Sequence, residues 1–193
     1  MKNIGLLGGS FDPPHKGHLY ISLEAKRFLK LDEIWWLVTP QNPHKGYRPA
    51  TYEDRLKNCK LLTKTLPIKI KEIEKKINSK YSYQTIRYLN NHYNNLNFYW
   101  LMGADNLINF HKWQKWQAIF KNMPVVIFKR HGYNTKALKS IAIKKFINFD
   151  FSKNFLFKKN FVNPPAWIWI NNKEIKISSS EIRRQREKWR NKN

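Results

Sequence analysis

The sequence contains a single cysteine, no internal repeat and no linker rich in glycine and serine. Cys59 alone cannot form an intramolecular disulfide or a zinc centre built from several cysteines, and we expect a small apolar helix residue there. The first apolar run is interrupted at Gly8, Gly9 and Asp12, so it is neither a signal peptide nor a membrane span of about 20 apolar residues. These absences predict a cytoplasmic protein with one domain over residues 1–193.

Acidic residues are also scarce, since 13 Asp and Glu oppose 37 Lys and Arg and leave a net charge of +24. Such an excess is typical of nucleic-acid binders. However, the lysines are scattered along the chain, and frequent Lys, Asn and Ile are also what an AT-rich genome encodes. The charge therefore indicates either a solvated surface or attraction to polyanions, including small ones such as nucleotide triphosphates.

The composition is that of a folded protein, because 41% of the residues are hydrophobic and 15% are aromatic. Strand-like and helix-like segments alternate, which favours a parallel sheet covered by helices. The expected strands are 2–7, 34–38, 68–73, 98–102, 124–128 and 166–170. The expected helices are 17–30, 51–63, 82–91, 104–110, 113–121, 135–146 and 180–190.

The most informative segment, GGSFDPPHKGH, runs from Gly8 to His18. Glycines end a strand and a helix is expected to begin near Gly17, where free N–H groups and the helix dipole favour an anion. His15 and His18 are three residues apart, so they share a helix face and can donate to phosphate oxygens. The segment is neither a Walker A loop nor a dinucleotide fingerprint. A metal pair and two core histidines are the alternatives.

Residues 9–18 of this segment resemble the His-x-Gly-His motif of the nucleotidylyltransferase superfamily. Five further stretches resemble bacterial nicotinate-nucleotide adenylyltransferases and follow in the family's order: TPQNPHK (39–45), YSYQT (81–85), LMGADN (101–106), FHKWQKW (110–116) and ISSSEIR (177–183). Together they cover nearly the whole chain. The resemblance implies an α/β fold, a Rossmann-like doubly wound parallel sheet of about five to six strands of the nucleotidylyltransferase type.

The resemblance also implies an activity. The family transfers AMP from ATP to nicotinate mononucleotide in NAD biosynthesis, giving deamido-NAD and pyrophosphate by direct attack of the mononucleotide phosphate on the α-phosphorus. Mg2+ is the expected cofactor and accompanies ATP, with no metal ligand assigned among the protein side chains. We expect ATP and nicotinate mononucleotide as partners and no membrane or nucleic-acid partner, and a homo-oligomer stays open.

Site residues follow from the same motifs. The expected catalytic residues are His15, His18, Lys45 and Arg183. The expected ATP contacts are the backbone of Gly8, Gly9, Ser10 and Phe11, then His15, His18, Gly103, Asp105, Ser178, Ser179, Ser180 and Arg183. For nicotinate mononucleotide, Asn42 and Thr85 would bind the carboxylate and Trp113 would stack on the pyridine ring, with Trp116 as the alternative ring.

Two positions depart from the family pattern. Gln84 stands where the family often has Asp, and His131 stands where an Arg-Pro-Gly stretch commonly has proline. Gln84 removes a negative charge near the acceptor loop, which bears on how the acceptor is bound. Nicotinamide mononucleotide and 4′-phosphopantetheine are the alternative acceptors, and Asn42, Thr85 and Trp113 argue against phosphopantetheine.

A different class of function also has to be considered. The Phe-rich segment 146–161 is either a packed or self-associating surface or a platform on which the bases of single-stranded RNA stack. An RNA-binding module without catalysis would fit this segment and the net charge. It would have no need of His15, His18, Asp105 and Arg183 together, which favours the enzyme.

Overall fold

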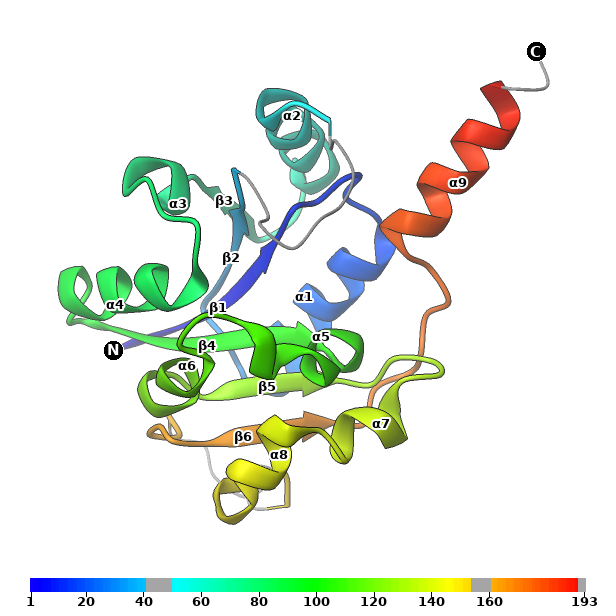
Figure 1. The fold of residues 1–193 in the computed structure, drawn as a ribbon. Coiled ribbons are helices and arrows are strands. Elements are labelled where there is room, and N and C mark those ends of the chain that lie inside the picture. Colours follow the sequence, from blue (N-terminus) through cyan, green and yellow to red (C-terminus); the bar gives the residue numbers. More distant parts are fainter. Residues whose placement is uncertain (41–49, 154–160, 191–193) are drawn as a thin grey trace.

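The structure is a computed structural model and describes residues 1–40, 50–153 and 161–190. Within these residues, one parallel sheet forms the centre (Figure 1). Its strands are β1 (Lys2–Gly9), β2 (Glu33–Val38), β3 (Ile68–Lys71), β4 (Leu96–Gly103), β5 (Val125–Phe128) and β6 (Trp167–Ile170). The strand order is β3-β2-β1-β4-β5-β6, with every neighbouring pair parallel. This order is that of a doubly wound sheet, so the predicted fold class is confirmed.

Helices cover both faces of the sheet, whereas α9 (Ser179–Arg190) projects away from it (Figure 1). The other described helices are α1 (Lys16–Phe28), α2 (Tyr52–Thr63), α3 (Ile73–Lys76), α4 (Ser82–His92), α5 (Ala104–Ile108), α6 (Trp116–Asn122), α7 (Asn134–Leu138) and α8 (Ile141–Lys145), with 3-10 turns at Phe110–Lys112 and Ile147–Phe149. No helix in the described part of the chain is both long and apolar enough to cross a membrane.

Alternation along the strands explains the two apolar layers. Leu6 and Trp100 belong to the layer that includes residues of α4, α5 and α6. Their neighbours Leu7 and Leu101 belong to the opposite layer, with residues of α1 and α2. Because successive strand residues point to opposite faces, continuous apolar runs are required when both faces are covered.

Among the expected elements that differ from the structure, three are instructive. The predicted helix 135–146 is divided at Ser140, whose extended backbone and hydroxyl begin α8 by accepting the N–H of Ile143 at 3.4 Å. α6 begins only at Trp116, because Lys115 has a left-handed φ of 50°. β3 ends at Lys71, and the apolar Ile73 that extended the predicted strand begins α3 instead.

The described residues of the Phe-rich segment are partly packed, since Phe146 is buried while Ile147 and Phe149 are exposed. Phe146 stacks on Phe120 with ring centroids 4.6 Å apart, and Phe161 meets Tyr99 edge-on at 5.1 Å. Residues 154–160 lie outside the described residues. These contacts favour the packed-surface interpretation for Phe146 and Phe161.

The direction of winding reverses between β1 and β4, since the chain proceeds outward from each strand toward opposite edges of the sheet. In such sheets a crevice opens outside the carboxyl ends of the strands at this point, and ligands bind there. β1 ends there in Gly8 and Gly9, and β4 ends in Gly103.

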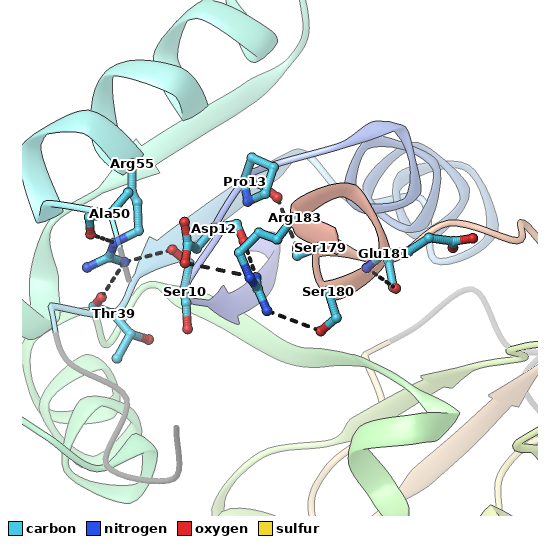
Figure 2. A network of polar contacts seen from close by, with 11 residues as sticks. Ser10, Asp12, Pro13, Thr39, Ala50, Arg55, Ser179, Ser180, Glu181 and Arg183 are labelled. Atoms are coloured by element: carbon cyan, nitrogen blue, oxygen red, sulfur yellow. Dashed lines mark hydrogen bonds and ion pairs between the residues drawn. The ribbon is translucent and has the colours of Figure 1, made fainter. Parts of the chain in front are cut away.

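Arg55 of α2 joins three chain segments at this edge (Figure 2). Its side chain is buried, with the residue 2% exposed. The guanidinium donates to the carbonyl oxygens of Ser10 at 2.7 Å, Thr39 at 2.8 Å, Pro40 at 2.8 Å and Ala50 at 3.1 Å. These four acceptors are neutral backbone groups that compensate a buried cation. Arg55 therefore fixes the chain after β1, after β2 and before α2.

Replacing Arg55 with alanine should lower the free energy of unfolding by about 3 kcal/mol or more, because buried carbonyls would lose their donors. Arg55→Lys should recover only part of this loss, since an ammonium lacks the planar fork that reaches several carbonyls. Urea unfolding at an unchanged m-value measures both effects. Arg27→Ala is the matched control on the exposed face of α1, where Arg27 pairs with Glu24, and it should leave the midpoint nearly unchanged. Equal midpoint shifts in the Arg55→Ala and Arg27→Ala variants would contradict this role of Arg55.

Candidate functional site

The loop between β1 and α1 carries the two predicted histidines. His15 is the N-cap of α1, and its Nδ1 accepts the backbone N–H of Gly17 at 3.1 Å. In return, the backbone N–H of His15 donates to Nδ1 of His18 at 3.2 Å. This reciprocal pattern is a capping box made of two imidazoles, whose centroids lie 3.9 Å apart. Because each Nδ1 accepts a hydrogen bond, a neutral ring carries its proton on Nε2.

His15 is only 7% exposed. Burial, followed by the nearby positive charge of Arg130, lowers the pKa of His15 to about 4. His15 is therefore neutral at pH 7 and offers an N–H donor rather than a full positive charge. A Cβ on Gly17 would lie 2.9 Å from the His15 ring, so the close approach of the ring to the helix start requires glycine.

The buried ring of Phe11 supports the loop between β1 and α1 from the core side. Its ring is buried, stacks on Trp36 at 4.6 Å with an interplanar angle of 12°, and lies 4.9 Å from the His18 ring. The residue has a φ of 49°, which is uncommon for a bulky side chain. The stacked ring compensates the strained backbone. The Phe11 side chain thus belongs to the core, and only its backbone is left for the predicted nucleotide contact.

The start of α9 docks onto the same loop (Figure 2). The Ser179 hydroxyl donates to the carbonyl oxygen of Pro13 at 3.0 Å. Arg183 donates from Nη1 to the carbonyl oxygen of Asp12 and from Nη2 to the Ser180 hydroxyl at 3.2 Å. Its Nη1 also lies 3.9 Å from Oδ2 of Asp12. The structure thus brings together the two predicted phosphate-binding segments, which are far apart in the sequence.

The segment after β4 contributes the carboxylate of Asp105, and the segment after β5 contributes Arg130. Oδ1 of Asp105 lies so close to Gly103 that a Cβ added to this glycine would be only 2.5 Å from the oxygen. Oδ2 of Asp105 lies 3.5 Å from Nε of Arg130. Arg130 also donates from Nη2 to the carbonyl oxygen of Ile177 at 3.0 Å. Arg130 therefore links the predicted residue Asp105 to the segment before α9 and acts electrostatically on His15, a role that sequence reasoning missed.

On the predicted acceptor side, Thr85 lies in the first turn of α4 and is fully buried, with 0% exposed. Its hydroxyl donates to Oε1 of Glu74 in α3 at 3.5 Å. The Thr39 side chain also acts on Glu74 and, like Thr85, favours its ionised form. Burial raises the pKa of Glu74 to about 7, although both threonine hydroxyls oppose the rise. The assignment of Thr85 to the nicotinate mononucleotide site stays a prediction. Its hydroxyl already contacts Glu74, a residue that sequence reasoning missed.

The two candidate stacking rings differ in their packing. Trp116 lies edge-on to Phe110, Phe120 and Phe146, with centroids 6.4, 6.4 and 6.0 Å away. Trp113 is tilted against Phe110 at 4.9 Å. Both are partly buried against the same core layer. The wider core packing of Trp116 favours Trp113 as the ring that a ligand could use.

Two predicted residues, Asn42 and Lys45, lie outside the described residues. Ser178, the first hydroxyl of the predicted anion site, accepts the backbone N–H of Glu181 at 3.2 Å and so caps α9. In residues 1–40, 50–153 and 161–190, no group of three or more His, Cys, Asp or Glu side chains could hold a metal ion.

Comparison with known proteins agrees with this geometry. A family model described as cytidylyltransferase-like matches residues 6–185. The "Probable nicotinate-nucleotide adenylyltransferase" of Ruegeria sp. (strain TM1040) is 40% identical over 182 residues, which are 94% of this chain and 96% of that protein. The protein of the same name from Pelagibacter ubique (strain HTCC1062) is 42% identical over 182 residues, covering 94% of this chain and 92% of its own length.

Solved structures share the fold. The nicotinic acid mononucleotide adenylyltransferase of Plasmodium falciparum complexed with NaAD has a TM-score of 0.71 at 20% identity, covering 95% of this chain and 83% of that chain. The same enzyme complexed with APC has a TM-score of 0.68, also at 20% identity, covering 95% and 83% of the two chains. On the family match and the near-full-length relatives, the chain belongs to the cytidylyltransferase-like family and, within it, to the nicotinate-nucleotide adenylyltransferases.

Proposed function

We propose that this protein transfers AMP from ATP to nicotinate mononucleotide, producing deamido-NAD and pyrophosphate. The observation that carries the proposal is the meeting, at the carboxyl edge of the sheet, of the two segments that the sequence predicts to bind phosphate. One is the His15–His18 cap of α1, and the other is the start of α9 with Ser179 and Arg183. In a chain of this family, that edge is where a triphosphate would lie.

The reaction needs little covalent help from the protein. An oxygen of the mononucleotide 5′-phosphate forms a bond to the α-phosphorus of ATP. The bond from that phosphorus to the oxygen bridging the β-phosphate breaks, and pyrophosphate leaves with the electron pair. A phosphate monoester is largely ionised at pH 7, so no general base is required. Positioning and stabilisation of charge are therefore the expected contributions of the protein.

The assigned residues can be ordered by the charge they offer. His15, being neutral, would donate from Nε2 to a phosphate oxygen, and His18 presents the same tautomer. Arg183 would add a full positive charge, with Lys45 beside it in the assignment. The glycine-rich end of β1 would let the nucleotide approach the backbone of residues 8–11.

The remaining assignments concern ATP on one side of the reacting phosphates and the acceptor mononucleotide on the other. Gly103 and Asp105 would face adenosine or the metal-bound triphosphate. Asn42, Thr85 and Trp113 would hold the acceptor. Mg2+ would enter as part of the substrate MgATP, where it shields the triphosphate and the leaving pyrophosphate. We further propose that the protein acts in the cytoplasm, where both nucleotides are made, and that it has no nucleic-acid partner.

The test measures pyrophosphate release with ATP and Mg2+ and compares nicotinate mononucleotide, nicotinamide mononucleotide and 4′-phosphopantetheine as acceptors. We expect release only when an acceptor is present, and the highest kcat/KM with nicotinate mononucleotide. Release with phosphopantetheine alone, or none with any acceptor, would overturn the proposal. Tight, salt-dependent RNA binding by such an inactive protein would favour the RNA-binding alternative.

His18→Ala should lower kcat by about 100-fold or more with little change in the acceptor KM, because the lost donor acts on charge that develops in the transition state. His18→Asn separates this role from helix capping, since it retains an acceptor near Nδ1 and lacks the Nε2–H. Steady-state kinetics and the unfolding midpoint are measured on both variants. His92→Ala on the exposed side of α4 is the control. Unchanged turnover in both His18 variants would refute the assigned role.

Trp113→Ala should raise the acceptor KM by about tenfold while changing stability little, because stacking on an aromatic face contributes mainly to binding. Trp116→Ala should instead lower the unfolding midpoint, because its ring packs against three core phenylalanines. Acceptor titrations and thermal unfolding distinguish the two. An acceptor defect confined to Trp116→Ala would show that Trp116 is the stacking ring.

A further inference from the structure

Glu74 is a buried acid that has no assigned role in the proposed reaction. The residue is 4% exposed, and its Oε2 has no hydrogen-bond partner among the residues that the structure describes. An unpartnered carboxylate oxygen in such a position is costly, and a buried acid is retained against this cost only with compensation. Its charge state therefore has consequences for whatever lies next to it.

Two threonines connect Glu74 to the acceptor side of the site. The Thr85 hydroxyl donates to Oε1 from the first turn of α4, at 3.5 Å. The Thr39 side chain, just after β2, also favours the ionised form of Glu74, and the backbone carbonyl of Thr39 is held by Arg55. The backbone of α3 adds a third connection, since the carbonyl oxygen of Glu74 accepts the N–H of Ser79 at 2.8 Å. Glu74 thus ties together the strand, the turn and the helix around the predicted acceptor.

The charged and titratable neighbours of Glu74 are committed elsewhere. On α2, the Arg55 guanidinium binds backbone carbonyls, and the Tyr52 hydroxyl donates to Glu72 at 3.3 Å. Glu72 lies 3.8 Å from Nζ of Lys60, and Lys75 pairs with Glu53 at 3.4 Å. From α4 and β2 the facing groups are the neutral hydroxyls of two threonines. In the described part of the chain, no cation neutralises Glu74.

We propose that Glu74 is a positioning residue of the acceptor site and sets the preference between an acid and an amide acceptor. This inference rests on the proposed function. One hydrogen bond separates Glu74 from Thr85, the residue assigned to the acceptor carboxylate. The Thr85 hydroxyl has one hydrogen, so it can donate to that carboxylate only when a neutral Glu74 does not take it. A neutral Glu74 tolerates a second carboxyl group on the far side of Thr85, whereas an ionised Glu74 repels it. An amide acceptor carries no charge at this position and is indifferent to the change.

The sign of the pH dependence follows from the burial of Glu74. Burial raises the pKa of Glu74 to about 7, so the side chain is neutral below pH 7 and ionised above it. The acceptor carboxyl group, with an ordinary pKa near 4, is ionised throughout. Discrimination in favour of the acid is therefore greatest below pH 7 and declines as the pH rises.

The test is the ratio of kcat/KM for nicotinate mononucleotide to kcat/KM for nicotinamide mononucleotide between pH 6 and 8.5. Both acceptors carry the same phosphate and use the same ATP, so the ratio cancels their titration and that of the catalytic residues. We expect the ratio to fall about tenfold over this range in the unmodified protein. In Glu74→Gln, which keeps an oxygen acceptor for the threonines, the ratio should stay flat.

Glu72→Gln is the matched control, because it removes the same charge two residues away at a side chain that is 41% exposed. It should retain the pH dependence of the unmodified protein. A flat ratio in the unmodified protein, or an equal fall in Glu74→Gln, would overturn the inference while leaving the adenylyl transfer intact. If neither acceptor gives pyrophosphate, the proposed function itself has failed.

A second readout does not depend on activity. Because the native pKa is raised, the protein loses stability as the pH rises from about 4.5 to about 7, and Glu74→Gln removes this loss. The unfolding midpoint of Glu74→Gln relative to the unmodified protein should therefore be higher at pH 8.5 than at pH 5. A difference that is the same at both pH values would contradict a buried, titrating Glu74.

Discussion

The loops at the carboxyl edge of the sheet, where the candidate site lies, depend on the buried guanidinium of Arg55. Parallel strands end in loops, and nothing in sheet hydrogen bonding fixes where those loops go. Here one planar cation gathers the carbonyl oxygens that follow β1 and β2 and those that precede α2. The chain around Ser10 and Thr39 thereby acquires a defined shape before any ligand arrives, which is the preorganisation that phosphoryl chemistry requires.

The side chains of His15 and His18 also fix the local structure of the candidate site. Each imidazole has two nitrogens, and the structure uses Nδ1 of both rings to close the first turn of α1. The cap thereby fixes the orientation of both rings. In the proposed reaction, Nδ1 of each side chain would have a structural role and Nε2 a chemical one, and the spacing His-x-x-His serves both.

Much of this molecule could be predicted from its sequence. The strands were readable because buried parallel strands consist of continuous apolar runs, as at 34–38 and 98–102. The segments containing His15 and Arg183 were identified because their motifs are local. Arg55, Glu74 and Arg130 were not found, since an arginine or glutamate in a charged helix or loop looks solvated until the tertiary contacts bury it. The division of 135–146 at Ser140 was missed because a serine in the middle of a helix and an N-cap look alike in sequence.

The contact between α9 and the first loop has a consequence for the time at which the protein becomes competent. Arg183 and Asp12 are 171 residues apart in the chain and meet at the carboxyl edge of the sheet. During synthesis on the ribosome, the strands can join the sheet in sequence before the second half of the proposed anion site has been made. A nascent chain can therefore acquire most of its core without a complete nucleotide site. The entropic cost of closing a loop grows only slowly with its length. The last helix can therefore dock late with little additional loss of entropy.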